Sequence, residues 1–354
     1  MNHLSARRAE GTCQAMAELI ETRAGHAQGD VRENVSQYRA FHDNAGGSVE
    51  SRKSRYTDMV RSYYDLATDI YEKGWGDSFH FAPRYRGEPF EVSIRRHQHY
   101  VALQLGLGEG QKALDVGCGV GGPMREIARF SGAHVTGVNI NGYQVQKVRE
   151  YNQRARLSSQ CDVVETDFMN IPRPDSSFDA IYAFEATCHA PDKTALFREL
   201  LRVLRPGGKI AIYEWCLTDR YEAANPTHQK LKRDIEEGNG LPDIWSIAGT
   251  RECFEQAGFR VLDVKDRALS GDPEVPWYFS LSGKELSNTG LRRSPVGKVM
   301  VKALTRTLEV ARIAPKGTAQ ITDVLNVGAD ALVRSGELGV FTPMAFFLAQ
   351  KPAG

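Results

Sequence analysis

LDVGCGVGGP, residues 114–123, connects an apolar β-strand pattern to a helical pattern. This order of strand, loop and helix is typical of a glycine-rich loop that binds a nucleotide. Gly117 and Gly119 allow the backbone to turn tightly and to approach a ligand, and Gly121 removes a side chain where the helix begins. An ordinary tight turn is the alternative, and the flanking elements together with Asp115 disfavour it.

From Lys112 onward, short apolar strands alternate with helical segments. The predicted strands span residues 112–117, 133–140, 161–167, 178–184, 209–215, 259–264 and 340–352. The predicted helices span residues 123–130, 144–153, 193–204 and 251–258. This alternation predicts a Rossmann-like α/β fold, with a mostly parallel sheet that is covered by helices on both faces. Ligands bind such sheets at the carboxyl ends of the strands.

The segments outside this region have a different character. Residues 56–74 and 93–106 show helical spacing, and each segment ends at a glycine. Residues 1–55 are polar and rich in turn-forming residues, which predicts a loosely ordered lead-in. Roughly seventy residues separate the last two predicted strands, which is too long for a loop, so we expect a cap there.

Composition argues against several classes of protein. Lys and Arg number 45 against 44 Asp and Glu, so the formal charge of +1 gives no strong field for nucleic acid. The six cysteines form no C-x-x-C pair, which argues against a zinc site or a disulfide framework, and we expect no metal. We also find no apolar run near the roughly 18 residues of a membrane-spanning helix and no secretory signal. We therefore expect a protein on the cytoplasmic side of the membrane.

The glycine loop suits either a dinucleotide or S-adenosyl-L-methionine. A dinucleotide site needs an acid at the end of the second strand, where this chain has Asn139 and Asn141. S-adenosyl-L-methionine presents an amine, which suits Asp115 just before the glycines. Asp167 follows the third strand, where it can accept a hydrogen bond from the adenine amine, with Phe168 beside the ring. We therefore predict a methyltransferase that uses S-adenosyl-L-methionine.

Several motifs resemble the sterol 24-C-methyltransferases of fungi, plants and algae, over roughly residues 56–352. They are YEKGWGDSFHF, LDVGCGVGGPMREIARF, FEATCHAPDK, YEWCLTDRYEAANPTHQ, VPWYFSL and FTPMAFFLAQKP. The resemblance implies a seven-stranded class I methyltransferase fold. It also implies methyl transfer to the C-24 double bond of a sterol of the cycloartenol or zymosterol type, through a carbocation, a hydride shift and a deprotonation.

With this resemblance, we expect four parts in the chain. They are the lead-in (residues 1–55), a helical and aromatic sterol-binding segment (residues 56–111), the cofactor-binding core (residues 112–270) and a C-terminal sterol methyltransferase cap that includes the final strand (residues 271–354). The resemblance also implies peripheral association with the cytoplasmic face of the endoplasmic reticulum.

The substrate site follows from the positions of the motifs. Tyr71, Trp75, Phe79 and Phe81 match the family's sterol-binding segment, whose rings would stabilise a cation without capturing it. The alternative is a helix end that packs on the sheet. Further substrate-binding candidates are His80, Glu214, Trp215, Trp277 and Tyr278. The last two either close over the sterol or anchor the cap.

The proton acceptor is expected after the fourth strand, where Glu185 and His189 lie beside the cofactor loop. Glu185 could instead hold the cofactor or a sterol hydroxyl, and His80 and His97 are rivals to His189. Tyr71 is expected beside the cation.

The chain departs from the family after its second strand. Gly142 stands where relatives often carry Asp in the motif NNNDYQ. Asn141 or Gln144 would then have to accept the ribose hydroxyls, since amide carbonyls accept such hydrogen bonds. Asn139 is a further cofactor-binding candidate.

Other functions and partners stay open. Residues 297–317 combine basic and apolar residues, so this stretch either lies on an anionic membrane surface or is a solvated helix. A homo-oligomer is also open. The runner-up functions are a related methyltransferase that acts on another lipid or a prenyl-quinol, and a catalytically silent sterol-binding protein.

Overall fold

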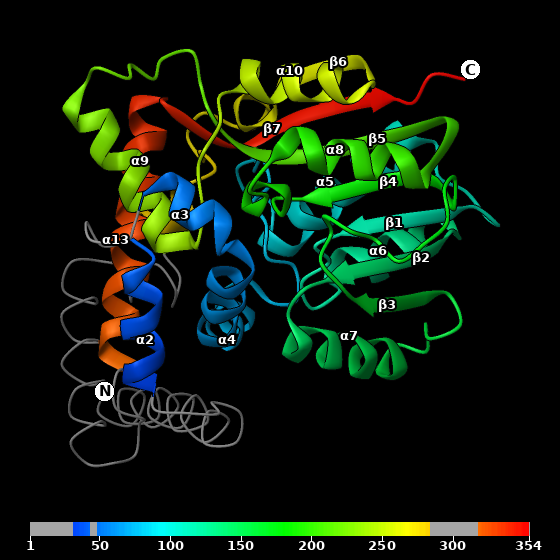
Figure 1. The fold of residues 1–354 in the computed structure, drawn as a ribbon, viewed down its shortest axis with the longest axis horizontal. Helices are drawn as coiled ribbons and strands as arrows, with labels where there is room; N and C mark the ends of the chain where they lie inside the picture. Colours follow the sequence, from blue (N-terminus) through cyan, green and yellow to red (C-terminus); the bar gives the residue numbers. More distant parts are fainter. Residues whose placement is uncertain (1–30, 43–47, 284–317, 354) are drawn as a thin grey trace.

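A seven-stranded sheet forms the centre of the computed structural model, which describes residues 31–42, 48–283 and 318–353 (Figure 1). The strands are β1 (Lys112–Val116), β2 (His134–Asn139), β3 (Cys161–Glu165), β4 (Phe178–Phe184), β5 (Leu204–Leu217), β6 (Arg260–Asp266) and β7 (Phe341–Gln350). They lie in the order β3-β2-β1-β4-β5-β7-β6. The pairs among β1 to β5 are parallel, whereas β7 is antiparallel to both of its neighbours. The predicted Rossmann-like α/β fold and its late seventh strand are confirmed.

Helices cover both faces of the sheet, so its side chains enter two separate cores. One face carries α5 (Phe90–Leu105), α6 (Gly122–Ser131) and α7 (Gly142–Arg154), and the other carries α8 (Lys193–Val203) and α10 (Ile247–Ala257). Successive residues of a strand point to opposite faces. As a result, β5 places Tyr213 and Trp215 in the first core and Ile212 and Cys216 in the second.

Helix ends follow from local side-chain chemistry. Asn141, Asp192 and Ser246 each accept a hydrogen bond from a backbone N–H in the first turn of α7, α8 and α10. Such caps satisfy N–H groups that have no partner within the helix. The first long helix does not stop at the predicted Gly74. It runs to Trp75 and is capped by Gly76, whose φ of 77° favours glycine.

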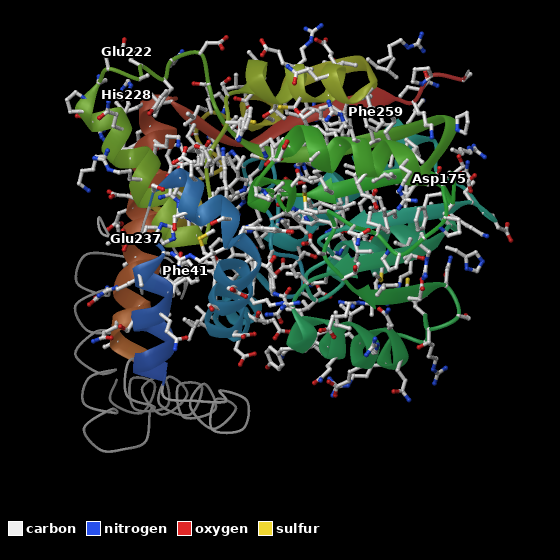
Figure 2. The ribbon with its side chains drawn as sticks, viewed as in Figure 1. Phe41, Asp175, Glu222, His228, Glu237 and Phe259 are labelled. Atoms are coloured by element: carbon white, nitrogen blue, oxygen red, sulfur yellow. The ribbon has the colours of Figure 1, made fainter. Side chains whose placement is uncertain are left out.

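Five helices of the described part of the chain gather beyond the carboxyl ends of the parallel strands, on the left in Figure 1. They are α2 (Val31–Ala40), α3 (Val49–Ser54), α4 (Tyr56–Trp75), α9 (Pro226–Asn239) and α13 (Thr318–Leu338). The helices α9 and α13 pack so closely that a Cβ atom on Gly238 would lie 2.3 Å from the Cα atom of Gly328. Figure 2 shows Glu237 and Phe41 on this helical flank and Asp175 at the opposite end of the sheet.

The first two of these helices differ from the predicted lead-in of residues 1–55. α2 buries Val35 and Tyr38 against α4 and α13. Arg52 of α3 forms a buried ion pair with Glu236 of α9, with 3.0 Å between Nη2 and Oε2. These two residues are 184 positions apart, so a local polar pattern could not reveal the contact.

Within the described ranges, three short 3₁₀ helices connect the larger elements: η2 (Thr187–His189), η3 (Arg267–Ser270) and η4 (Phe279–Leu281). In the described part of the chain, no helix combines the length and the apolar character needed to cross a membrane. The predicted amphipathic stretch of residues 297–317 lies outside the described residues.

Candidate active site

The glycine loop between β1 and α6 lines the first of two adjacent pockets, which we call the loop pocket. Gly117 and Gly119 line it with φ angles of 71° and 54°, a conformation that favours glycine. A Cβ atom on Gly117 would also lie 2.4 Å from the Cβ atom of Ala186. The loop pocket has about 720 Å³ of open space. Gly121 does not line it, and serves instead as the N-cap of α6.

Asp115, near the end of β1, supplies a hydrogen-bond acceptor to the loop pocket. Its side chain is buried, and its Oδ2 atom has no hydrogen bond of standard geometry among the described residues, although the Tyr182 hydroxyl interacts with this carboxyl group. Burial raises the pKa of Asp115 to about 7, because the charged form loses its hydration, while the Tyr182 hydroxyl acts to lower this pKa. A cationic ligand group would satisfy this oxygen, as we expect for the amine of the cofactor.

Two amide side chains form the wall beside the glycine loop. Asn139 donates from Nδ2 to the Gly119 carbonyl at 3.0 Å and to Gln144 Oε1 at 2.8 Å, and both amides line the loop pocket. Asn141 differs from the expectation, because it is absent from the pocket lining. Its Oδ1 caps α7, and its Nδ2 donates to Asp65 Oδ1 at 2.7 Å. Asn141 therefore joins α7 to α4.

Phe168 and Asp167, the two residues expected beside the adenine, have different surroundings. Phe168 lines the loop pocket, and Tyr56 stacks against it with 6.5 Å between ring centroids. Asp167 lies next to it in sequence, but its Oδ1 accepts a hydrogen bond from the Met169 backbone N–H at 2.8 Å. Asp167 is not part of the pocket lining, so only the predicted ring faces the ligand space.

Aromatic rings line the second pocket, the ring pocket, which has about 540 Å³ of open space. Tyr71 contacts Phe79 and Trp75 with ring centroids 5.6 Å and 5.8 Å apart, and Trp75 contacts Phe81 at 6.0 Å. Trp215 also lines this pocket. Five of the predicted rings therefore surround one cavity: Tyr71, Trp75, Phe79, Phe81 and Trp215.

Trp277 and Tyr278 lie outside both pocket linings. Trp277 is buried against Phe81, with ring centroids 5.0 Å apart. Tyr278 packs on Trp277 and on α13, where a Cβ atom on Gly336 would lie 2.3 Å from its ring. This placement favours the anchoring alternative for both residues.

Glu214 also differs from the expectation of a substrate contact, since it lines neither pocket. It is fully buried, and its Oε2 lies 3.0 Å from Lys193 Nζ of α8. Thr187 donates a hydroxyl hydrogen bond to the same carboxylate. The physical reason is strand alternation: because Trp215 faces the ring pocket, its neighbour Glu214 faces the opposite core.

Glu185 lines both pockets. Its φ of 54° is rare for a residue other than glycine, and such strain costs about 1–3 kcal/mol and clusters at functional sites. Oε1 accepts from the Phe81 backbone N–H at 2.6 Å, and Oε2 accepts from Trp215 Nε1 at 2.7 Å. Burial raises the pKa of Glu185 to about 8. The carboxyl group is therefore fixed in orientation.

His189 also lines both pockets. Its Nδ1 lies 3.0 Å from the Gly240 carbonyl oxygen, and its Nε2 lies 3.0 Å from the Tyr64 hydroxyl. Burial lowers the pKa of His189 to about 4, so the ring is neutral near pH 7.

The two rival histidines have structural surroundings. His80 lines both pockets, but its ring nitrogens lie within hydrogen-bond distance of the Phe81 carbonyl oxygen (2.8 Å) and Gln98 Nε2 (2.9 Å). His97 lines neither pocket and stacks on Tyr213, with ring centroids 3.7 Å apart.

The two pockets share a wall. Five side chains line both of them: Tyr64, Phe79, His80, Glu185 and His189. A polar ligand held by Asp115 and the glycine loop would therefore meet an apolar molecule among the rings. This arrangement suits the transfer of a group between the two molecules.

Comparisons with known proteins agree with this geometry. Residues 114–212 match the model of a methyltransferase domain, and residues 288–353 match the sterol methyltransferase C-terminal model. The chain is 50% identical over 323 residues to cycloartenol-C-24-methyltransferase of Arabidopsis thaliana, covering 91% of this chain and 96% of that relative. It is 44% identical over 310 residues to sterol 24-C-methyltransferase of Saccharomyces cerevisiae, covering 86% and 81%. The chain belongs to the sterol 24-C-methyltransferase family.

A solved structure with low sequence identity shares the fold of this methyltransferase. Geranyl diphosphate C-methyltransferase of Streptomyces coelicolor, in complex with S-adenosyl-L-homocysteine, has a TM-score of 0.60 at 16% identity. The match covers 84% of this chain and 97% of that chain. As a sterol methyltransferase, the enzyme uses S-adenosyl-L-methionine, and the buried carboxyl group of Asp115 beside the glycine loop fits its amine. The predicted family, enzyme class and cofactor are confirmed.

Sequence reasoning missed Tyr64, which completes the shared wall. It lies seven residues before Tyr71 on α4, and residues seven apart share one face of a helix. That spacing would have placed Tyr64 beside the predicted ring.

Proposed function

We propose that this enzyme methylates C-24 of a sterol of the cycloartenol or zymosterol type, with a carbocation intermediate inside the ring pocket. The observation that supports this proposal is the shared wall, because it sets an apolar, ring-lined cavity directly against the cofactor pocket. Membership of the sterol 24-C-methyltransferase family supports the choice of substrate and carbon atom.

Bound S-adenosyl-L-methionine supplies an electrophilic methyl group on a positively charged sulfur. Asp115 and the glycine loop hold this donor on one side of the shared wall. The rings around Tyr71 hold the sterol side chain on the other side, so that its double bond faces the methyl group. Such alignment can remove about 7–11 kcal/mol of a barrier, which matters because an alkene is a weak nucleophile.

Attack by the double bond leaves a positive charge on the neighbouring carbon of the sterol. Tyr71, Trp75 and Phe79 stabilise this charge with their π faces, each by about 0.5–2 kcal/mol, and cannot form a bond with it as water would. The pocket rings also exclude water, which would otherwise convert the cation to an alcohol. A hydride shift and the loss of a proton then give the alkene.

Glu185 presents an oriented carboxyl group beside the sulfonium and the sterol cation. With a pKa of about 8 it is mostly neutral near pH 7 in the free enzyme, and a bound sulfonium favours its ionised form because opposite charges attract. The N–H groups of Phe81 and Trp215 favour its ionised form, which acts against the effect of burial. His189 receives the proton in the last step. Both roles match the positions of these residues in the shared wall.

The experiment that tests the proposal is incubation of the enzyme with labelled S-adenosyl-L-methionine and a panel of sterols, followed by mass spectrometry. We expect one label per product on the side chain of a sterol with a C-24 double bond, and none on its saturated analogue. Label in a prenyl-quinol or another lipid, with none in any sterol, would refute the assignment. Cofactor binding without turnover on any acceptor would favour the silent sterol-binding alternative.

A pair of Tyr71 variants tests the role of the rings. Tyr71→Leu removes the π face, so turnover should fall by about tenfold or more while the affinity for S-adenosyl-L-homocysteine changes little. Tyr71→Phe keeps the ring and is the matched control. Equal losses of turnover and cofactor affinity in Tyr71→Leu would contradict a role beside the cation.

We also propose that the enzyme works on the cytoplasmic face of the endoplasmic reticulum as a peripheral protein. A sterol substrate is nearly insoluble in water and reaches the enzyme from a bilayer, which supports this location. Flotation with phospholipid vesicles, with and without sterol, tests it. An enzyme that stays at the bottom of the gradient under all conditions would contradict membrane association.

A further inference from the structure

We infer that Tyr64 takes the proton that leaves the methylated side chain and that His189 relays it, so that the two side chains act as one acceptor. This inference rests on the proposed function, and it adds a residue that the sequence did not indicate. The Tyr64 hydroxyl would contact the substrate, whereas His189 would act through it.

The hydrogen-bond pattern fixes the direction of the relay. A carbonyl oxygen can only accept, so the 3.0 Å contact between His189 Nδ1 and Gly240 means that Nδ1 carries hydrogen. In a neutral imidazole the other nitrogen is then an acceptor. His189 Nε2 therefore accepts the hydroxyl hydrogen of Tyr64 at 3.0 Å, and the phenol oxygen keeps its lone pairs for a new proton.

The positions of Tyr64 and His189 support their role as one proton acceptor. Tyr64 and His189 both belong to the shared wall, where the methyl donor and the sterol side chain meet. Tyr64 belongs to α4, and His189 belongs to η2, which follows β4. Their rings are in edge-on contact, with 5.4 Å between the ring centroids. A proton acceptor has to lie within about 3 Å of the hydrogen that leaves, and these residues line the space in which it leaves.

Other polar groups of the ring pocket also have hydrogen-bond partners. Tyr63 donates its hydroxyl hydrogen to the Gly238 carbonyl oxygen at 3.1 Å. In the hydrogen bond between the Tyr63 and Tyr71 hydroxyls, Tyr71 is therefore the donor. Both carboxylate oxygens of Glu185 accept N–H hydrogen bonds. Both nitrogens of His80 have partners as well. Among these groups, Tyr64 is the one whose hydrogen already points along a route to a second base.

The chemistry balances without any further reactant. A C–H bond next to the cationic carbon breaks, and its electron pair becomes the new π bond. The proton binds the Tyr64 oxygen as the original phenol proton moves to His189 Nε2, which leaves an imidazolium and a neutral phenol. A hydrogen beside a carbocation is a strong acid, so a weak neutral base suffices. Burial keeps His189 neutral until that step, with a pKa near 4.

The imidazolium that forms has a favourable neighbour. Gly240, whose carbonyl holds Nδ1, is the C-cap of α9, so the ring lies at the C-terminal end of that helix. The unpaired carbonyls there carry partial negative charge and favour a cation. The same carbonyl therefore selects the tautomer before the step and stabilises the charge after it.

The test compares the wild type, Tyr64→Phe, His189→Asn and the double variant, with Tyr38→Phe as the matched control. Tyr38 also donates a hydrogen bond to a carbonyl near the end of α9, but it lies outside both pockets. Each protein is incubated with trideuteromethyl S-adenosyl-L-methionine and the accepted sterol. The alkene isomers and any side-chain alcohol are then quantified by mass spectrometry.

We expect Tyr64→Phe and His189→Asn to raise the ratio of alcohol or of a second alkene isomer to the normal product about a hundredfold, the lower end of the effect of losing a general base. The double variant should match the single ones, and Tyr38→Phe should keep the wild-type product ratio. Affinity for S-adenosyl-L-homocysteine should stay within about threefold throughout. Unchanged product ratios in Tyr64→Phe would overturn the inference. If that variant does not bind the cofactor analogue, unchanged ratios in His189→Asn overturn it instead.

The proposed function and the proton relay would be refuted by different results. Absence of methylated sterol from the wild type would refute the proposed function. Normal sterol methylation with an unaltered product ratio in the variants would refute the proton relay alone.

Discussion

Removal of the buried cation of Lys193 should destabilise the fold without affecting either pocket. Lys193 and Glu214 are at most 1% exposed, and their Nζ and Oε2 atoms lie 3.0 Å apart. Lys193→Met would leave the carboxylate buried with Thr187 and the Trp215 backbone N–H as its donors. Breaking one side of a buried pair costs about 3–5 kcal/mol, because the remaining charge has lost its hydration and its partner.

Urea unfolding followed by circular dichroism measures this cost. At a slope of about 3 kcal/mol per molar, a loss of 4 kcal/mol lowers the midpoint by about 1.3 M. The double variant Lys193→Met with Glu214→Leu should lose no more than about 2 kcal/mol, mainly from the hydroxyl of Thr187, because an apolar pair often replaces a buried ion pair at little cost. All variants should bind S-adenosyl-L-homocysteine normally while folded. A loss below about 1 kcal/mol in Lys193→Met, or a double variant that loses the sum of both single changes, would refute the reasoning.

Three further changes have clear expected outcomes. The carboxylate of Asp115 forms as pH rises through about 7. The affinity for S-adenosyl-L-homocysteine, measured by calorimetry, should therefore rise nearly tenfold from pH 5.5 to 6.5 and level off above 7.5. Asp115→Asn should abolish this pH dependence. Glu185→Gln should weaken binding of S-adenosyl-L-methionine more than binding of its uncharged-sulfur analogue, and equal losses in a calorimetric comparison would contradict a charge that faces the sulfonium. Gly238→Ala places a methyl group 2.3 Å from the Cα atom of Gly328, so thermal melting should show a loss of about 1–3 kcal/mol in the free energy of unfolding. In the control Gly74→Ala, the added methyl group has nothing within 4 Å, so stability should be unchanged or increased.

The cofactor half of the site was largely predictable, because its signals are local. Asp115, Gly117 and Gly119 lie within five residues, and the strand and helix that position them are adjacent in sequence. Asn141 shows the limit even there. An amide can bind a ligand or cap a helix, and the sequence does not tell which of these uses the fold requires.

The substrate half depends on contacts between distant segments. The rings of α4 were recognised, but their partners from α9 and α13 lie far along the chain. For the same reason, the helices α2 and α3 were not predicted within the lead-in. Glu214 could have been excluded by strand alternation alone, since Trp215 was assigned to the same site. Tyr64 could have been included by helical spacing.

The place of β7 within the sheet has a consequence for synthesis on the ribosome. β6 pairs with β7 and lies at the sheet edge, so it has no strand partner until β7 is made. The ends of these strands, Asp266 and Gln350, are 84 residues apart, which takes roughly 4–17 s at about 5–20 residues per second. Throughout that interval the nascent chain presents the apolar β5 with one open edge. A chaperone that covers exposed strands would act on this enzyme during that window.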